Sequence, residues 1–337
     1  MTNQYLPLIS VVIPMFNVES YIKQCIDSVL AQSFKNFEVI CVDDGCTDET
    51  LNLVSEYNDS RIRVIQQKNR GLSGARNTGI FAARGVYVAL LDADDFWAVD
   101  KLSQHINHLN ARPHIDVSYS PSLFVNEQGE ELGIGQFPLL EGVTFKNVIC
   151  RNPVGNGSAP VIRKKALLAH AYPLEGESRK QIFNESLRQS EDIELWVRMS
   201  ARKDNSFEGI AAPLTFYRVN EGGLSANLNK QYSSWYNAIN GLKAEIQSIT
   251  PSILSLAKAY QLRYLARRAI QSGSAWSALK LVHKALLCNP KILIEETGRT
   301  TLTYACAFLA VAPSFVYKPI ENVAMRFAAS RIAQGKA

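Results

Sequence analysis

Three carboxylates stand close together where a buried strand is expected to end, in the segment VALLDADDFW at residues 88–97. Asp92, Asp94 and Asp95 fill three of four consecutive positions, and like charges this close raise one another's pKa unless something compensates them. A divalent cation, a helix N-terminus or solvent could each do so. Mg²⁺ and Mn²⁺ take oxygen ligands and commonly bind one or two carboxylates together with substrate phosphates. A helix cap needs only one aspartate, so the triplet favours a cation site.

These carboxylates follow the last of four strands predicted in the first hundred residues. Short apolar runs alternate there with amphipathic stretches, and we expect strands at 8–14, 37–43, 61–66 and 85–92 and helices at 18–32, about 46–57, 72–83 and about 97–111. Near-continuous apolar strands separated by helices are typical of a parallel sheet covered on both faces. Ligands bind such sheets outside the carboxyl ends of the strands. The polar residues that follow the strands therefore predict a binding edge.

The loop after the third strand, NRGLSGARNTG at 69–79, contains three glycines. Their spacing fits neither the G-x-G-x-x-G dinucleotide fingerprint nor the G-x-x-x-x-G-K-[ST] phosphate loop, which disfavours a Rossmann dehydrogenase and a P-loop enzyme. Gly71 and Gly74 still permit close backbone approach, and the helix behind them would present free N–H groups to an anion. Arg76 could add a charge-assisted contact to a diphosphate. Taken alone, these glycines could equally make a simple turn.

The rest of the chain is mixed and then helical. A helix is predicted at 191–201, and further strands are predicted at 115–120, 122–132 with a turn at 128–129, 158–167 and 210–219. From about residue 229 the pattern is helical, and 264–290 resembles one helix–turn–helix unit of a repeat protein. The apolar segment 301–317 has about the minimum length of a membrane span, but Pro313 interrupts it, which favours a buried or interfacial helix.

Charge is unevenly distributed along the 337 residues. Residues 241–337 contain 13 Lys and Arg against four Asp and Glu, whereas residues 1–240 contain 23 against 27, so the net charge of +5 comes from the C-terminal part. No recognisable nucleic-acid module accompanies these basic residues, so we expect no nucleic-acid partner. The six cysteines lack zinc-site spacing, and the N-terminus lacks a basic region followed by an apolar stretch. Both features favour a cytoplasmic location with free thiols.

Five stretches occur in the order seen in family-2 glycosyltransferases and together resemble that family: SVVIPMFNVESYI (10–22), VDDGCTDET (42–50), GLSGARNTGI (71–80), LLDADDFW (90–97) and SEDIELWVRM (190–199). The resemblance covers roughly residues 8–220. It implies an α/β fold of GT-A type, with a Rossmann-like, mostly parallel central sheet flanked by helices. We expect this domain at residues 1–225, followed at 226–337 by a C-terminal helical extension that could contact a membrane surface or a second copy of the chain.

The family's motifs, carried over position by position, imply a nucleotide-sugar site. The donor-binding residues would be Pro14, Asn17, Glu19, Asp44, Arg76, Asp92, Asp94 and Arg218. Within this set, Asp44 would hydrogen-bond the base, commonly uracil, and Arg76 would lie near the diphosphate. The D-x-D motif would contact the ribose and a divalent metal, Mn²⁺ or Mg²⁺, with Asp94 and Asp95 as the metal ligands.

The segment SEDIELWVRM matches the family's E-D motif, so Asp192 would be the general base, with Glu191 as the competing candidate. A capped amphipathic helix, with Ser190 as N-cap, explains the same residues, and both interpretations can hold at once. The sequence departs from the family pattern at two positions. Cys46 replaces the usual serine, and Asn220 replaces a histidine that can help to hold the metal, which would weaken the metal site.

Together these features predict an inverting, metal-assisted glycosyltransferase of the surface-polysaccharide type, either a hexosyl- or an N-acetylhexosaminyl-transferase. It would move a sugar from a nucleotide-diphosphate donor, commonly a UDP-sugar, to a hydroxyl of a glycan or lipid-linked acceptor. A positioned carboxylate would take the proton of that hydroxyl. The loops at 133–158 and 172–190 would select the acceptor, and the basic helical region could rest on the inner face of the plasma membrane. A non-catalytic sugar-nucleotide-binding or assembly subunit and a nucleotidyltransferase are the alternatives.

Overall fold

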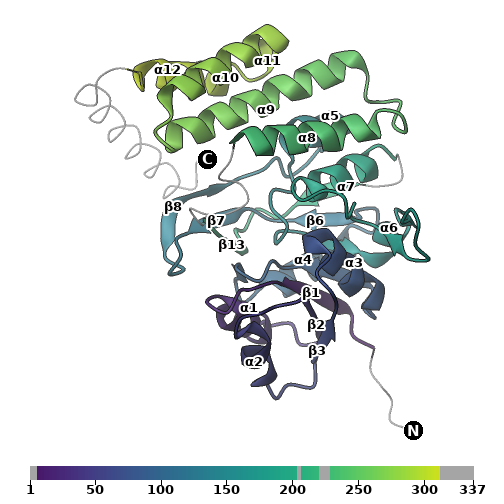
Figure 1. Ribbon diagram of the computed structural model, residues 1–337. Helices are drawn as coiled ribbons and strands as arrows, with labels where there is room; N and C mark the ends of the chain where they lie inside the picture. Colours follow the sequence, from purple (N-terminus) through teal and green to yellow (C-terminus); the bar gives the residue numbers. More distant parts are fainter. Residues whose placement is uncertain (1–5, 203–205, 220–227, 312–337) are drawn as a thin grey trace. The chain divides into compact units, whose positions relative to one another are not determined.

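The computed structural model describes residues 6–202, 206–219 and 228–311. Two compact units divide the chain: Met1–Phe145 with Pro153–Glu221, and Lys146–Asn152 with Gly222–Ala337. Within the described residues, all strands belong to the first unit, and the second unit is helical (Figure 1). Asn220 lies outside the described residues, so its effect on metal binding stays a prediction.

A seven-stranded sheet in the order β12-β6-β9-β4-β1-β2-β3 forms the centre of the first unit. Its strands are β1 (Ile9–Met15), β2 (Phe37–Asp43), β3 (Ile62–Gln66), β4 (Tyr87–Leu90), β6 (Val117–Tyr119), β9 (Val161–Arg163) and β12 (Phe207–Gly209). β1 pairs in parallel with β2 and β4, and β2 with β3, whereas β9 is antiparallel to β4 and β6. The expected mostly parallel sheet is confirmed.

The pairing register brings the carboxyl ends of three strands to one edge. β1 and β2 run together until Met15 lies opposite Asp43. On its other side, β1 pairs with β4 up to Val12 opposite Leu90. The loops after β1, β2 and β4 therefore start at a common edge of the sheet, as predicted.

Helices cover both faces of this sheet: α1 (Ile22–Leu30), α2 (Thr50–Ser55), α3 (Gly71–Ala82) and α4 (Lys101–Ala111). On one face, residues of α1 and α4 such as Ile26 and Leu102 form a buried cluster with Val11. The next residue of β1, Val12, points to the opposite face. There α3 lies so close that a Cβ at Gly79 would come within 2.3 Å of Val12 Cγ1. Burial on both faces explains the near-continuous apolar strands.

A second sheet and several short elements complete the first unit. The sheet has the order β5 (Phe96–Trp97), β13 (Thr215–Arg218), β7 (Ser122–Val125) and β8 (Glu131–Gln136). β7 and β8 form the hairpin predicted at 122–132. The short elements are α6 (Lys164–Leu168), β10 (Tyr172–Pro173), β11 (Lys180–Gln181) and α7 (Glu191–Ser200). The strand predicted at 158–167 is wrong in its second half, because α6 follows β9 directly, and the strand predicted at 210–219 begins only at Thr215.

The second unit consists of most of α5 (Phe145–Arg151) with α8 (Leu228–Leu242), α9 (Pro251–Gln271), α10 (Ala275–Cys288), α11 (Lys291–Glu295) and α12 (Thr297–Leu309). Small buried side chains such as Ala266, Ala278 and Ala307 let α9, α10 and α12 pack closely. The helix–turn–helix predicted at 264–290 is confirmed, whereas α5 was not predicted. None of the helices in the described ranges is both long and apolar enough to cross a membrane.

Gly79→Ala is expected to destabilise the protein, because the added methyl group would overlap Val12 of the sheet. Overpacking of this kind typically costs about 1–3 kcal/mol. Gly241→Ala in α8 is the matched control, since its added Cβ meets nothing within 4 Å and replacing a helix glycine stabilises by roughly 0.5–1 kcal/mol. Urea unfolding followed by circular dichroism compares the two variants, and equal midpoints would contradict the packing argument.

Candidate functional site

Two loops are joined at the carboxyl edge of the central sheet. Asn17, just after β1, has a left-handed backbone with φ 52°, and its Oδ1 accepts a hydrogen bond from the Thr47 amide at 2.8 Å. Glu19 Oε2 accepts one from the Glu49 amide at 2.9 Å. Pro14 is buried in β1, past the end of its pairing with β4. The structure thus brings Pro14, Asn17 and Glu19 to the edge where the nucleotide pocket was expected.

Asp44, at the end of β2, is buried and caps helix α3. Its carboxylate accepts hydrogen bonds from the Gln67 side-chain amide at 2.6 Å and from the backbone amides of Arg70 and Gly71 at 2.8 Å. Burial raises the pKa of Asp44, and these hydrogen bonds act against the rise. The expectation that the helix presents its first amides free to a phosphate is wrong for Arg70 and Gly71, because Asp44 already accepts from both.

Arg76, a residue that is 1% exposed, joins α3 to the loop after β4 and to α7 through its guanidinium. Its Nη2 lies 2.5 Å from Asp92 Oδ1, and its Nη1 lies 2.7 Å from Glu191 Oε1. The Phe183 ring packs against it at 5.3 Å. Burial by itself would lower the pKa of Arg76, but the charges of Asp92 and Glu191 raise it above its ordinary value. We call this three-residue arrangement the Arg76 bridge.

The loop before β9 closes over the Arg76 bridge. A Cβ at Gly157 would lie 2.2 Å from Arg76 Nη2 and 2.8 Å from Asp92 Oδ2, so a side chain there would displace the bridge. The neighbouring Ser158 Oγ accepts a hydrogen bond from the Asp92 amide at 3.0 Å and donates one to Asp95 Oδ2 at 2.5 Å. Sequence reasoning did not single out either residue, because both lie in the loop-like segment 133–158.

The three carboxylates of the segment DADD have different environments. Asp95 is buried, and its oxygens accept hydrogen bonds from the Ser158 hydroxyl and from the Arg218 amide, the latter at 2.8 Å. Arg218 is also buried, and its side chain donates to the Asp94 carbonyl at 2.8 Å and to three further oxygens of the protein. Asp92 and Asp94 are only partly buried. Burial and the charge of Asp92 raise the pKa of Asp94 to about 6.

A divalent cation at this edge would need ligands beyond the protein. No group of three or more His, Cys, Asp or Glu side chains in the described part of the chain is arranged to hold a metal. Mg²⁺ and Mn²⁺ are commonly bound, however, by one or two carboxylates together with substrate phosphates. Asp92 and Asp94 supply two partly exposed carboxylates with the hard oxygen donors that these ions prefer. The donor set fits a cation that binds together with a phosphorylated ligand.

Helix α7 begins in an unusual backbone conformation beside the Arg76 bridge. Ser190 has φ 64°, in the left-handed region. Its side chain makes no capping hydrogen bond, so the prediction that Ser190 caps this helix with its side chain is wrong. Glu191 is buried against Arg76, whereas Asp192 is partly exposed. Burial and the charge of Glu191 raise the pKa of Asp192 to about 7. Asp192 can therefore exchange a proton near neutral pH.

Two further residues near this edge were missed from the sequence. Arg188 lies against the start of α3, because a Cβ at Gly71 would come within 2.3 Å of its Nη1. It belongs to the loop 172–190, where no sequence motif singles out one cation. Asn77 is buried in α3, and its Oδ1 accepts the amides of residues 182 and 183 at 3.0 and 2.8 Å, which fixes the segment that leads to α7.

Comparisons with known proteins identify the family and the fold. Residues 10–155 match the profile of "Glycosyl transferase family 2". The Escherichia coli UDP-Glc:alpha-D-GlcNAc-diphosphoundecaprenol beta-1,3-glucosyltransferase WfaP is 30% identical over 255 residues, which are 70% of this chain and 88% of WfaP. The uncharacterized Bacillus subtilis glycosyltransferase EpsJ is 50% identical over 93 residues, 27% of each protein. Two Rickettsia glycosyltransferases match over 33% of their length, so the chain spans a third or less of these longer relatives.

Solved structures share the fold at low sequence identity. S. aureus TarS 1–349 in complex with UDP-GlcNAc has a TM-score of 0.52 at 19% identity, covering 97% of this chain and 92% of that one. The Pyrobaculum calidifontis mannosyltransferase PcManGT, in complex with GDP-Man and Mn²⁺, has a TM-score of 0.51 at 19% identity, covering 91% and 88%. The expected α/β fold of GT-A type, followed by C-terminal helices, is confirmed.

Asp192→Asn is expected to change how stability depends on pH. A carboxylate whose pKa is raised on folding contributes stability that is complete below its ordinary pKa of about 4 and is lost as pH rises through its folded value, about 7 for Asp192. The variant cannot lose this contribution, so its free energy of unfolding should rise relative to the wild type between these two values. Urea unfolding at a series of pH values measures the difference.

Asp59→Asn is the control for this experiment. Hydrogen bonding to Arg61 lowers the pKa of Asp59, so its contribution is present above its ordinary pKa and is lost only in acid. The difference in free energy of unfolding between Asp59→Asn and the wild type should therefore stay constant over the pH range in which the difference between Asp192→Asn and the wild type changes. A constant difference between Asp192→Asn and the wild type would contradict the raised pKa of Asp192.

Proposed function

The chain belongs to glycosyltransferase family 2, and we propose that it is an inverting enzyme that transfers a sugar from a UDP-sugar, with Mn²⁺ or Mg²⁺, to a hydroxyl of a lipid-linked acceptor. The observation that carries this proposal is the Arg76 bridge, which holds Asp92 and Glu191 and leaves Asp192 beside them with a pKa near neutrality. Glycosyl transfer needs side chains with different roles, because one group must take the proton of the acceptor hydroxyl while others stabilise the departing diphosphate.

Asp192 is the proposed general base. A pKa of about 7 makes it a stronger base than an ordinary aspartate while leaving it largely ionised at slightly alkaline pH. Glu191 is buried, and its Oε1 lies 2.7 Å from Arg76 Nη1, so this carboxylate already has a charged partner in the interior. In this proposal Glu191 holds Arg76 in position and is not the base. Arg76 holds Asp92 and Glu191 in position and does not contact the diphosphate directly. When the base removes the proton of the acceptor hydroxyl on the side of the sugar opposite the departing diphosphate, the configuration at the anomeric carbon is inverted.

The donor would bind along the carboxyl edge of the sheet. The pocket for the base would be built from the loops after β1 and β2, by Pro14, Asn17, Glu19 and Asp44. UDP is the proposed nucleotide because WfaP is named for UDP-Glc and TarS was solved with UDP-GlcNAc, which also favours hexosyl or N-acetylhexosaminyl transfer. Arg188, exposed against the start of α3, is the proposed cation for the diphosphate, since Arg218 is buried and donates within the protein.

Asp92 and Asp94 would hold the divalent cation together with the donor's phosphates. Such a cation, when bound, neutralises charge on the departing diphosphate, and PcManGT was solved with Mn²⁺. Asp95, expected as a metal ligand, is buried between Ser158 and Arg218, so we propose that it orients the loop that carries Asp94. In this assignment the partly exposed carboxylates of Asp92 and Asp94 bind the ion, and the buried carboxylate of Asp95 orients the loop.

The proposed acceptor is lipid-linked because WfaP is named for a diphosphoundecaprenol acceptor. Relatives of this kind support a role for the protein in surface-polysaccharide assembly. All six cysteines are free thiols, which supports a reducing compartment and the cytoplasmic side of the membrane. The loop 172–190 lies directly before Asp192 in the chain and would contact the acceptor.

Release of UDP from UDP-Glc or UDP-GlcNAc, with an alkyl-diphosphate-linked GlcNAc as acceptor, tests the proposed function. Asp192→Asn should lower kcat by at least about 10²-fold, the usual contribution of a general base, while UDP binding measured by calorimetry stays unchanged. In the wild type, kcat/KM should rise with pH and level off above about 7, because the base must be ionised.

Glu191→Gln distinguishes the two acids. It removes one partner of Arg76 and should lower activity, but the rise of kcat/KM with pH should remain because Asp192 is still present. If Glu191→Gln abolishes that rise and Asp192→Asn retains it, the base is Glu191. A wild type that binds UDP-sugars but never releases UDP with any acceptor would instead be a binding subunit.

Asp94→Asn is expected to weaken Mn²⁺ binding at least about tenfold when UDP is present, since the variant loses one of two charged oxygen ligands. Electron paramagnetic resonance of free Mn²⁺ measures this independently of activity. Asp100→Asn, an exposed acid six residues along the chain, is the control and should bind Mn²⁺ as the wild type does. Equal Mn²⁺ affinity of Asp94→Asn and the wild type would contradict the assignment.

A further inference from the structure

Large apolar side chains are exposed on α10, α11 and α12 of the second unit. Trp276, Leu287, Ile294, Leu302 and Phe308 are each between 63% and 85% exposed. Single exposed apolar residues are ordinary, but a contiguous group marks an interaction site. The question is therefore whether these five lie together.

Helix geometry places the exposed residues of α10 on one face. Trp276, Lys280 and Leu287 are separated by four and seven residues, spacings that return to the same side of a helix. Ala278 and Ala285, each offset by two residues from this row, are buried in the opposite face. The apolar residues thus share one exposed face with a lysine.

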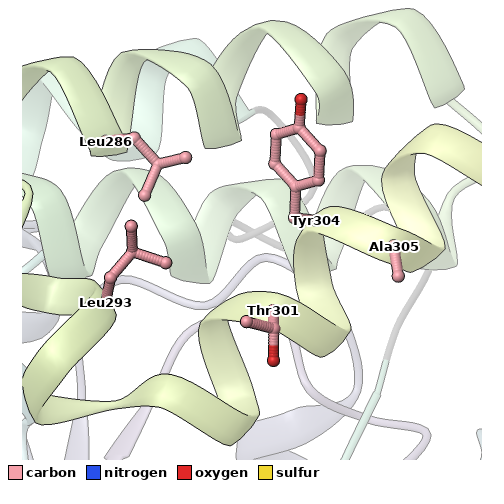
Figure 2. A pocket seen from close by; sticks show the side chains of 5 residues that line it. All are labelled: Leu286, Leu293, Thr301, Tyr304 and Ala305. Atoms are coloured by element: carbon pink, nitrogen blue, oxygen red, sulfur yellow. The ribbon is translucent and has the colours of Figure 1, made fainter.

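A pocket of about 260 Å³ is lined by residues of α10, α11 and α12 (Figure 2). Its lining residues are Leu286, Leu293, Thr301, Tyr304 and Ala305. Three of them directly precede an exposed apolar residue in the chain, namely Leu287, Ile294 or Leu302. Phe308 lies one helical turn beyond Tyr304 and Ala305. Leu287, Ile294, Leu302 and Phe308 therefore lie beside one apolar pocket, and Trp276 lies further along the exposed face of α10.

Basic side chains near this pocket have no acidic partner. Residues 228–311 contain ten Lys and Arg against three Asp and Glu. Two of those acids, Glu295 and Glu296, pair with basic residues of α5, α9 and α12. Lys280, Lys284 and Lys291 form no ion pair within the part of the chain that the structure describes. The surface is apolar with uncompensated positive charge.

We propose that this surface, formed by Trp276, Lys280, Lys284, Leu287, Lys291, Ile294, Leu302 and Phe308, docks onto an anionic lipid bilayer. The apolar side chains would enter the boundary between headgroups and acyl chains, and the lysines would contact lipid phosphates, the arrangement found in helices that lie in a membrane interface. A second copy of the chain is a poorer occupant, because a shared face would bring like charges together. Docking would bring the enzyme to the lipid-linked acceptor, and only this purpose rests on the proposed function.

Trp276 gives a direct readout of docking. The other three tryptophans, at 97, 196 and 235, are at most 4% exposed, so a change in solvent exposure reports on Trp276. Vesicles that contain phosphatidylglycerol should shift tryptophan emission to shorter wavelength and protect it from acrylamide, and vesicles of phosphatidylcholine alone should do neither. Trp276→Phe should remove the shift while the protein still sediments with anionic vesicles.

Two double variants separate the charged from the apolar contribution. Lys280→Glu/Lys284→Glu and Leu287→Asp/Ile294→Asp should each weaken sedimentation with anionic vesicles at least about tenfold. All four positions are exposed, so the variants should fold. The matched controls, at exposed positions of the first unit, are Lys35→Glu/Lys165→Glu and Leu6→Asp/Val86→Asp, and both should bind vesicles as the wild type does.

Equal binding to anionic and neutral vesicles, or binding to neither, would overturn the proposal. A change in molar mass for Leu287→Asp/Ile294→Asp, measured by light scattering without lipid, would show instead that a second copy covers this face. UDP release with a water-soluble acceptor keeps the two proposals apart, since it should be unchanged in both double variants. Vesicle binding without any UDP release would refute the proposed activity and leave docking intact.

Discussion

The first unit is organised around one buried positive charge. The guanidinium of Arg76 is 1% exposed and stays ionised because Asp92 and Glu191 lie within 2.7 Å of it. Removing one partner of such a pair leaves an uncompensated charge in the interior, which typically costs about 3–5 kcal/mol. The contact therefore constrains three elements at once: α3 carries Arg76, the loop after β4 carries Asp92, and α7 begins with Glu191.

Neighbouring contacts hold the same three elements. Asn77 follows Arg76 in α3 and accepts two amides of the segment that leads to α7. Gly157 has no side chain, which lets the loop before β9 approach the Arg76 bridge. Ser158 then bonds to both Asp92 and Asp95. These contacts hold Asp92 in place without a bound ligand, as electrostatic preorganisation requires.

The sequence predicts the edge of the site better than its interior. Parallel strands with apolar residues on both faces must place their following loops at one edge, so the meeting of the loops after β1, β2 and β4 could be foreseen. The contact between Arg76 and Glu191 could not be foreseen, because the two residues are 115 positions apart in the chain and their contact depends on how α7 packs. Asp44 shows a second limit, since the same carboxylate suits base binding and helix capping. Lys101 shows a third: it looks like a surface lysine of α4, yet it is buried and donates to the Ala159 carbonyl.

The two acids of α7 have different environments, and this difference supports separate roles for them. Glu191 has a guanidinium partner that compensates its charge in the interior. Asp192 lies next to that charge, and burial raises its pKa to about 7. A carboxylate of this kind destabilises the folded protein when it ionises, so stability alone gives no reason to keep it. A group that weakens the fold but can accept a proton near neutral pH is better explained by chemistry at the site than by packing.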